Sequence, residues 1–128
     1  MNYYFNKIET GQFDSIVARL IEALKKEGFG VLTDIDVKET LKKKLDVEFR
    51  NYRILGACNP TLAHQALGSE DKIGLMLPCN VIAQDLGGGR VELAAINPLL
   101  AMESLGNPKL TAIAEEVAVR LRRVIDSV

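Results

Sequence analysis

The chain has 128 residues, which fits one domain, because a chain of this size buries about two-thirds of its unfolded surface. Sixteen basic and seventeen acidic residues leave a net charge of −1, which excludes the basic balance of nucleic-acid-binding and membrane-surface proteins. The longest apolar run is interrupted by Pro78 and Asn80, and the first residues lack the basic and apolar regions of a signal peptide. We therefore expect one domain over residues 1–128, located in the cytoplasm, with neither nucleic acid nor membrane as a partner.

Strand and helix patterns alternate in the first half of the chain. A helix that ends before Gly28 is predicted by apolar residues at the spacing of one helix face: Phe13, Ile16, Val17, Leu20 and Leu24. Composition and periodicity predict strands over residues 1–9, 29–37 and 48–58, and helices over residues 37–45 and 60–67.

The second half begins with two strand-like runs and ends with a long helix. The runs cover residues 72–78 and 80–85, and the glycines of residues 86–90 predict a hairpin turn before a strand over residues 91–96. From Asn107 onward, one apolar stripe predicts an amphipathic helix: Leu110, Ile113, Ala114, Val117, Leu121, Val124 and Ile125. This order favours an α+β fold: a single-domain two-layer sandwich, with a mixed or largely antiparallel sheet and helices packed on one face.

Several polar motifs have a local structural explanation. Proline follows asparagine at Asn59-Pro60, Asn97-Pro98 and Asn107-Pro108, where asparagine can cap a helix whose first residue is proline. Asp34 and Asp36 could form a divalent metal pair on one strand face, but Asp36 also stands where the helix over residues 37–45 should begin. We interpret Asp36 as a helix cap.

The two cysteines occur in related motifs, Cys58-Asn59-Pro60 and Pro78-Cys79-Asn80. If a strand ends at Cys58 and a helix begins at Pro60, Cys58 lies beside the positive end of a helix dipole, which favours a thiolate. Pro78 cannot donate to a sheet ladder and therefore marks an edge, a bend or a bulge that re-aims Cys79. Two neighbouring strands would bring the two sulfur atoms together.

His64 lies one helical turn after Pro60, so its ring could approach the same region. Cys58, His64 and Cys79 would then supply three metal ligands with a fourth position open. The opposite interpretation is equally well supported, because cysteine is often a buried, inert core residue and both cysteines have apolar neighbours.

The segments from Gly28 to Leu45, Tyr52 to Leu67, Ile73 to Val81 and Ile96 to Met102 resemble the prokaryotic family called domain of unknown function 302. The resemblance is densest from Gly28 to Met102 and implies a compact α+β domain that forms homodimers. The resemblance implies no particular activity. Any family site would correspond here to the two cysteine motifs and His64: Cys58, Asn59, Pro60, His64, Pro78, Cys79 and Asn80.

Three functions follow from these patterns. The first is a small cytoplasmic binding module, not an enzyme, that holds zinc, copper or a small anionic ligand between the motifs Cys58-Asn59-Pro60 and Pro78-Cys79-Asn80. The second is a thiol enzyme or redox relay, with Cys58 as the nucleophile, His64 as the base and Cys79 as the resolving thiol. The third is a structural homodimer whose cysteines are inert core residues.

Overall fold

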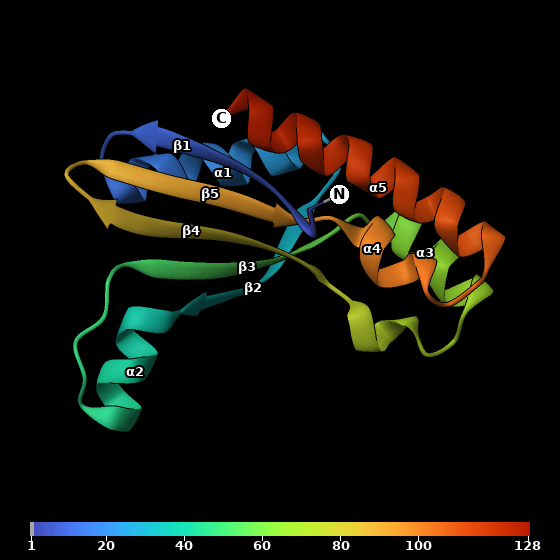
Figure 1. Ribbon diagram of the computed structural model, residues 1–128, viewed down its shortest axis with the longest axis horizontal. Coiled ribbons are helices and arrows are strands. Elements are labelled where there is room, and N and C mark those ends of the chain that lie inside the picture. The colour runs from blue at the N-terminus through green and yellow to red at the C-terminus, as the bar shows by residue number, and fades with distance from the viewer. Residues whose placement is uncertain (1) are drawn as a thin grey trace.

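The structure is a computed structural model that describes residues 2–128, so residue 1 of the strand predicted over residues 1–9 lies outside it. In chain order its elements are β1 (Tyr4–Thr10), α1 (Phe13–Lys26), β2 (Gly30–Asp36), α2 (Val37–Leu45), β3 (Tyr52–Cys58), α3 (Pro60–Ser69), the 3-10 helix η1 (Ile73–Met76), β4 (Cys79–Gly87), β5 (Arg90–Ile96), α4 (Pro98–Glu103) and α5 (Pro108–Ser127). Figure 1 shows them as a twisted sheet with a helical layer, α3 and α4 at one end, and α2 standing apart.

All neighbouring strands in the sheet are antiparallel, in the order β1-β5-β4-β3-β2. The first two strands of the chain therefore form opposite edges, and α1 crosses the sheet between them. The predicted hairpin turn joins β4 to β5, where Gly87, Gly88 and Gly89 all adopt positive φ angles that favour glycine. The predicted α+β sandwich is confirmed, and its sheet is wholly antiparallel among the described residues.

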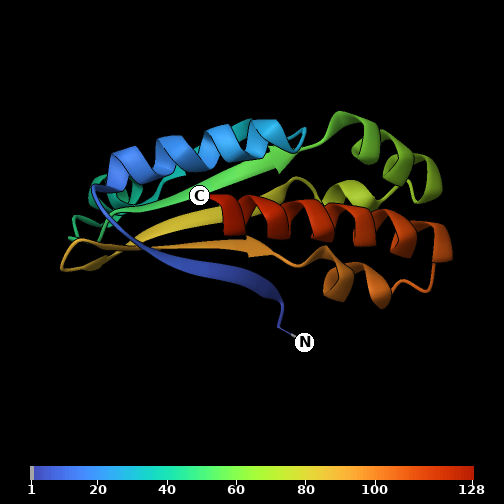
Figure 2. The ribbon, with the colours of Figure 1, turned by 90° about the horizontal axis from the view of Figure 1, so that it is seen from above.

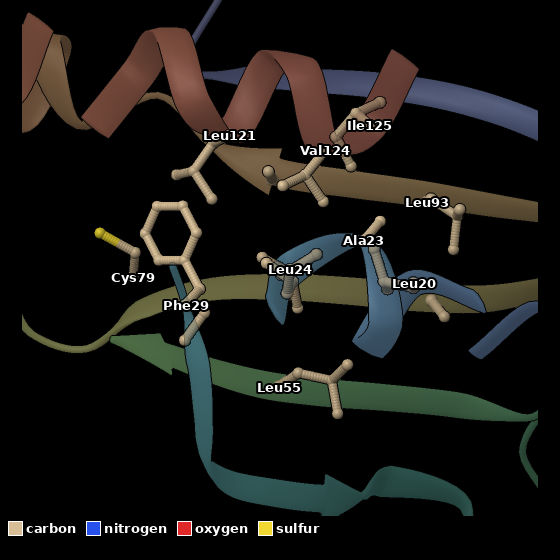
Figure 3. Packing of buried hydrophobic residues seen from close by; sticks show 14 of the residues in the cluster. Leu20, Ala23, Leu24, Phe29, Leu55, Cys79, Leu93, Leu121, Val124 and Ile125 are labelled. Atoms are coloured by element: carbon tan, nitrogen blue, oxygen red, sulfur yellow. The ribbon is translucent and has the colours of Figure 1, made fainter. Parts of the chain in front are cut away.

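Helices α1 and α5 lie side by side on one face of the sheet (Figure 2). Figure 3 shows the core beneath them, in which leucines of α1 meet Leu55, Leu93 and the apolar stripe of α5. The stripe continues toward the start of α5, where Leu110 and Ala114 join Met102, Ala66 and Ile73 in a second buried cluster. Helix α5 thus belongs to both clusters, which confirms its predicted amphipathic face.

No helix layer formed by residues 2–128 covers the other face of the sheet, which we call the open face. Alternation along the paired strands places these side chains on it: Tyr4, Asn6, Ile8, Thr33, Ile35, Tyr52, Ile54, Gly56, Asn80, Ile82, Gln84, Glu92, Ala94 and Ile96. Helix α2 lies beyond the β2 and β3 side of the sheet and has no buried residue.

The strand predicted over residues 72–78 is wrong. Residues 73–76 form η1, whose Ile73 is buried in the second cluster, and the strand begins only at Cys79. Pro78 has no N–H to donate to the ladder, so it precedes the strand instead of interrupting it. In so short an apolar run, the spacing of the apolar residues does not distinguish a strand from a helical turn.

The predicted caps are confirmed. Asn59, Asn97 and Asn107 each accept a backbone N–H bond from the first turn of α3, α4 and α5, with proline at the first helical position. Asp36 likewise accepts from the Glu39 N–H at 3.0 Å, and Asp34 pairs with Arg53. Across residues 2–128, no helix combines the length and apolar character needed to cross a bilayer.

Candidate functional site

Cys58 and Asn59 form the junction between β3 and α3. The Asn59 carboxamide oxygen accepts from the Leu62 N–H at 3.1 Å, and its backbone oxygen accepts from the Ala63 N–H at 2.9 Å. The amide end of the side chain faces Gly28, where a Cβ would lie only 2.8 Å from Asn59 Nδ2. Gly28 also has a φ of +86°, so both its backbone and the close approach require glycine. The end of α1 therefore helps to fix this junction.

Cys79 lies at the start of β4, directly opposite Ala57 and one position from Cys58 in the pairing of β3 with β4. Figure 3 places it beside the Phe29 ring at one end of the core, and its side chain is buried. Burial raises the pKa of the Cys79 thiol to about 11, and the neighbouring Cys58 pushes this pKa in the same direction. Cys79 is therefore a protonated thiol at neutral pH.

The two cysteines line one small pocket of about 30 Å³ at the meeting point of the two buried clusters. Its remaining walls come from β3, α3, α4, α5 and the segments before α3, β2 and β4: Phe29, Ala57, Asn59, Leu62, Ala63, Ala66, Leu77, Pro78, Met102, Ile113 and Val117. A volume of this size accommodates an ion or a few water molecules, whereas sites for organic ligands measure hundreds of Å³. Both cysteines are free thiols.

The other candidate residues lie elsewhere. His64 is exposed on α3 and is not among the pocket residues, and neither is the exposed Pro60. Asn80 points to the open face. Within residues 2–128, no three or more histidine, cysteine, aspartate or glutamate side chains gather into a metal-binding group, so the set Cys58, His64 and Cys79 does not assemble.

Met102 is a pocket residue with a sulfur atom that the sequence patterns did not single out. It lies on α4, is buried, and lines the same pocket as the two cysteines. Three sulfur-containing residues, from β3, β4 and α4, therefore line the pocket. The only signal in the sequence was the Asn97-Pro98 cap that starts α4, and it gave no indication of where α4 would pack.

The start of α3 leaves little room for an anion. Pro60 has no N–H, and the N–H groups of Leu62 and Ala63 are already bonded to Asn59, so only Thr61 remains among residues 60–63. The start of α3 therefore offers an anion only one backbone donor among residues 60–63.

Comparison with known proteins agrees with this architecture. No curated protein matches the chain. A crystal structure of an uncharacterised conserved DUF302 protein from Bacillus stearothermophilus superposes with a TM-score of 0.90 at 28% sequence identity, covering 98% of each chain. The family model for the domain of unknown function DUF302 matches residues 6–128. The chain belongs to the DUF302 family.

Proposed function

We propose that this protein is a small binding module whose pocket holds a single soft metal ion, with monovalent copper as the best match. One observation carries the proposal: Cys58, Cys79 and Met102 all line one small pocket whose walls are otherwise largely apolar. Thiolate and thioether sulfur select Cu(I) over harder ions such as Mg²⁺ and Ca²⁺. Zinc fits less well, because structural zinc takes four nitrogen, sulfur or carboxylate ligands, and the described residues offer no such group.

The same environment argues against the thiol-enzyme alternative. A nucleophilic or resolving thiol works as a thiolate, yet burial raises the pKa of Cys79 to about 11. The base assigned to that mechanism, His64, is exposed and does not line the pocket. The raised pKa does not exclude metal binding in the same way, because a bound metal ion itself displaces the thiol proton. We place the protein in the cytoplasm, where two free thiols stay reduced.

The test is titration of the purified protein with Cu(I) under anaerobic, reducing conditions against a chromophoric Cu(I) chelator. We expect one ion per chain, and an affinity at least about tenfold lower in Met102→Leu, which keeps the apolar volume but removes the sulfur donor. The double variant Cys58→Ser, Cys79→Ser should lose the site.

His64→Ala is the matched control, because it removes a metal-binding side chain that lies outside the pocket. Its Cu(I) affinity should equal that of the parent chain. Equal Cu(I) binding by the double cysteine variant would contradict the proposal and leave the two cysteines as core residues.

A further inference from the structure

The tyrosines of this chain gather at one place on the open face. The chain has three tyrosines, four phenylalanines and no tryptophan. All three tyrosines, Tyr3, Tyr4 and Tyr52, line a single hollow of about 410 Å³, whereas three of the phenylalanines pack in the main core. A hollow of this volume is within the range of sites for small organic molecules. It therefore has the size and the aromatic lining of such a site.

The floor of the hollow is apolar and low. Ile82 on β4 and Ala94 on β5 lie directly opposite each other at its centre, and both side chains are half-buried. The side chain of Ala94 ends at Cβ, so it leaves space above the sheet that a longer side chain would fill. The centre of the hollow can therefore accommodate the apolar body of a ligand.

The two ends of the hollow lie four residues apart along β5. At one end, Ile96 of β5 pairs with Tyr4 of β1. At the other end, Glu92 of β5 pairs with Gln84 of β4, which in turn pairs with Tyr52 of β3. At the usual rise of a strand, these ends are roughly 13 Å apart. The hollow is thus elongated, with a tyrosine at each end and a carboxylate at one of them.

Glu92 is the only charged residue among the described residues that line the hollow. Its half-buried carboxylate accepts from Asn6 Nδ2 at 3.0 Å and from Gln84 Nε2 at 2.8 Å. Both donors are neutral amides, so they orient the carboxylate without neutralising its charge. A negative charge beside an apolar floor attracts a positively charged group and repels an anion. The charge of the hollow is therefore complementary to a cation.

The tyrosine rings favour the same charge. The face of an aromatic ring attracts a cation that lies within about 6 Å of its centroid. The Tyr52 ring already has such a neighbour, because the Arg50 guanidinium lies 5.7 Å from its centroid, although Arg50 does not line the hollow. Arg50 also donates to the Gln84 oxygen at 2.9 Å, which orients the Gln84 amide toward Glu92. Ring and carboxylate together make this end of the hollow suitable for a positive charge.

We propose that the hollow binds an organic cation, an amine or quaternary ammonium group carried on an aromatic body. The charged group lies between Glu92 and Tyr52, and the aromatic body covers Ile82 and Ala94 in the direction of Tyr4. The sulfur-lined pocket lies on the other side of the sheet, among residues of α3, α4 and α5, so the two sites are separate.

Tyrosine fluorescence tests this proposal directly, because the chain has no tryptophan and all three tyrosines line the hollow. The probes are 2-phenylethylamine, 2-phenylethanol and 3-phenylpropionate, which share one aromatic body and at neutral pH carry a positive charge, no charge and a negative charge. Titration of the whole chain should give a saturable change with the amine, at an affinity at least about tenfold above that of the alcohol. The anionic probe should bind most weakly.

Glu92→Gln removes the charge and keeps a hydrogen-bonding side chain of the same shape. It should lower the affinity for the amine by at least about tenfold and change that for the alcohol by less than about threefold. Ala94→Leu should weaken the binding of both probes, because the longer side chain fills the floor. Glu115→Gln is the matched control, because Glu115 is exposed on α5, in the helix layer on the opposite face of the sheet (Figure 2). Its affinities should equal those of the parent.

Equal affinities of the parent for the amine and the alcohol would overturn the proposal, and so would equal effects of Glu92→Gln and Glu115→Gln. Absence of a saturable signal with the amine would overturn it as well. The double variant Cys58→Ser, Cys79→Ser should bind the amine as the parent does, because its substitutions lie in the other pocket. Failure of the metal proposal and failure of this one are therefore distinguishable.

Discussion

At the residue scale, the buried thiol of Cys79 should make the free energy of unfolding depend on pH. Its pKa rises from 9.0 to about 11 on folding, so between these values the unfolded chain releases a proton that the folded chain retains. The stability that this thiol contributes to the folded chain is fully present below about pH 9. It is lost as the pH rises through 11, by about 3 kcal/mol of unfolding free energy in total. Urea unfolding at pH 8 and pH 10.5 should show about 2 kcal/mol of this loss in the parent and none in Cys79→Ala. Parallel pH profiles of the two proteins would contradict it.

Gly56 supports a second prediction at this scale. A Cβ on Gly56 would overlap Thr33 Oγ1 and lie 2.7 Å from Pro78 Cγ, because the proline ring covers this point of β3. Gly56→Ala should therefore lower the free energy of unfolding by about 1–3 kcal/mol. Gly74→Ala is the control, since no atom lies within 4 Å of its added Cβ. Equal unfolding free energies for the two variants would contradict this prediction. They would show that Pro78 moves away from β3 to accommodate the added methyl group at no cost in stability.

At the scale of elements, Asn107 joins two helices. Its oxygen accepts from the N–H groups of Lys109 and Leu110, and its amide nitrogen donates to the backbone oxygen of Ser69 at the end of α3. Asn107→Ala should cost about 1–2 kcal/mol of unfolding free energy, because it removes both the cap and the link.

Asn107→Asp separates the two contributions. It keeps the cap oxygen and adds a charge that favours the helix N-terminus, but it cannot donate to Ser69. Thermal or urea unfolding should rank the parent first, Asn107→Asp second and Asn107→Ala last. A loss in Asn107→Asp as large as that in Asn107→Ala would mean that the link to α3, and not the cap, carries the stability.

At the scale of the whole molecule, stability should depend on protein concentration. In the homodimer that the family resemblance implies, dilution favours the separated and unfolded chains, so a tenfold dilution should lower the Tm by about 2–4 °C. Calorimetry at several concentrations checks this. A concentration-independent Tm for the parent would argue against a folding-linked dimer.

The local elements of this protein were predictable from sequence. The Asn-Pro caps, the glycine turn after β4 and the amphipathic stripe of α5 were all recognised, because each depends on residues within a few positions of one another. The strand predicted over residues 72–78 failed for the complementary reason. Its Ile73 is held by α5 and α4, which lie more than twenty residues away in the chain.

The candidate site was only half predictable. The pairing of β3 with β4 brings Cys58 and Cys79 to one pocket, as the two related motifs suggested, but helix phase leaves His64 exposed on α3. Met102 was missed because a buried methionine looks like any other core residue until its neighbours are known.

Sequence alone thus determined the α+β class, the asparagine-capped helix starts and the two cysteine motifs, since local hydrogen bonding and apolar periodicity encode them. Tertiary structure decided three things: the order of the strands, the gathering of three sulfur-containing residues around one pocket, and the absence of a helix layer over the open face among the described residues. Each depends on contacts between segments far apart in the chain, and such contacts leave no periodic trace in the sequence.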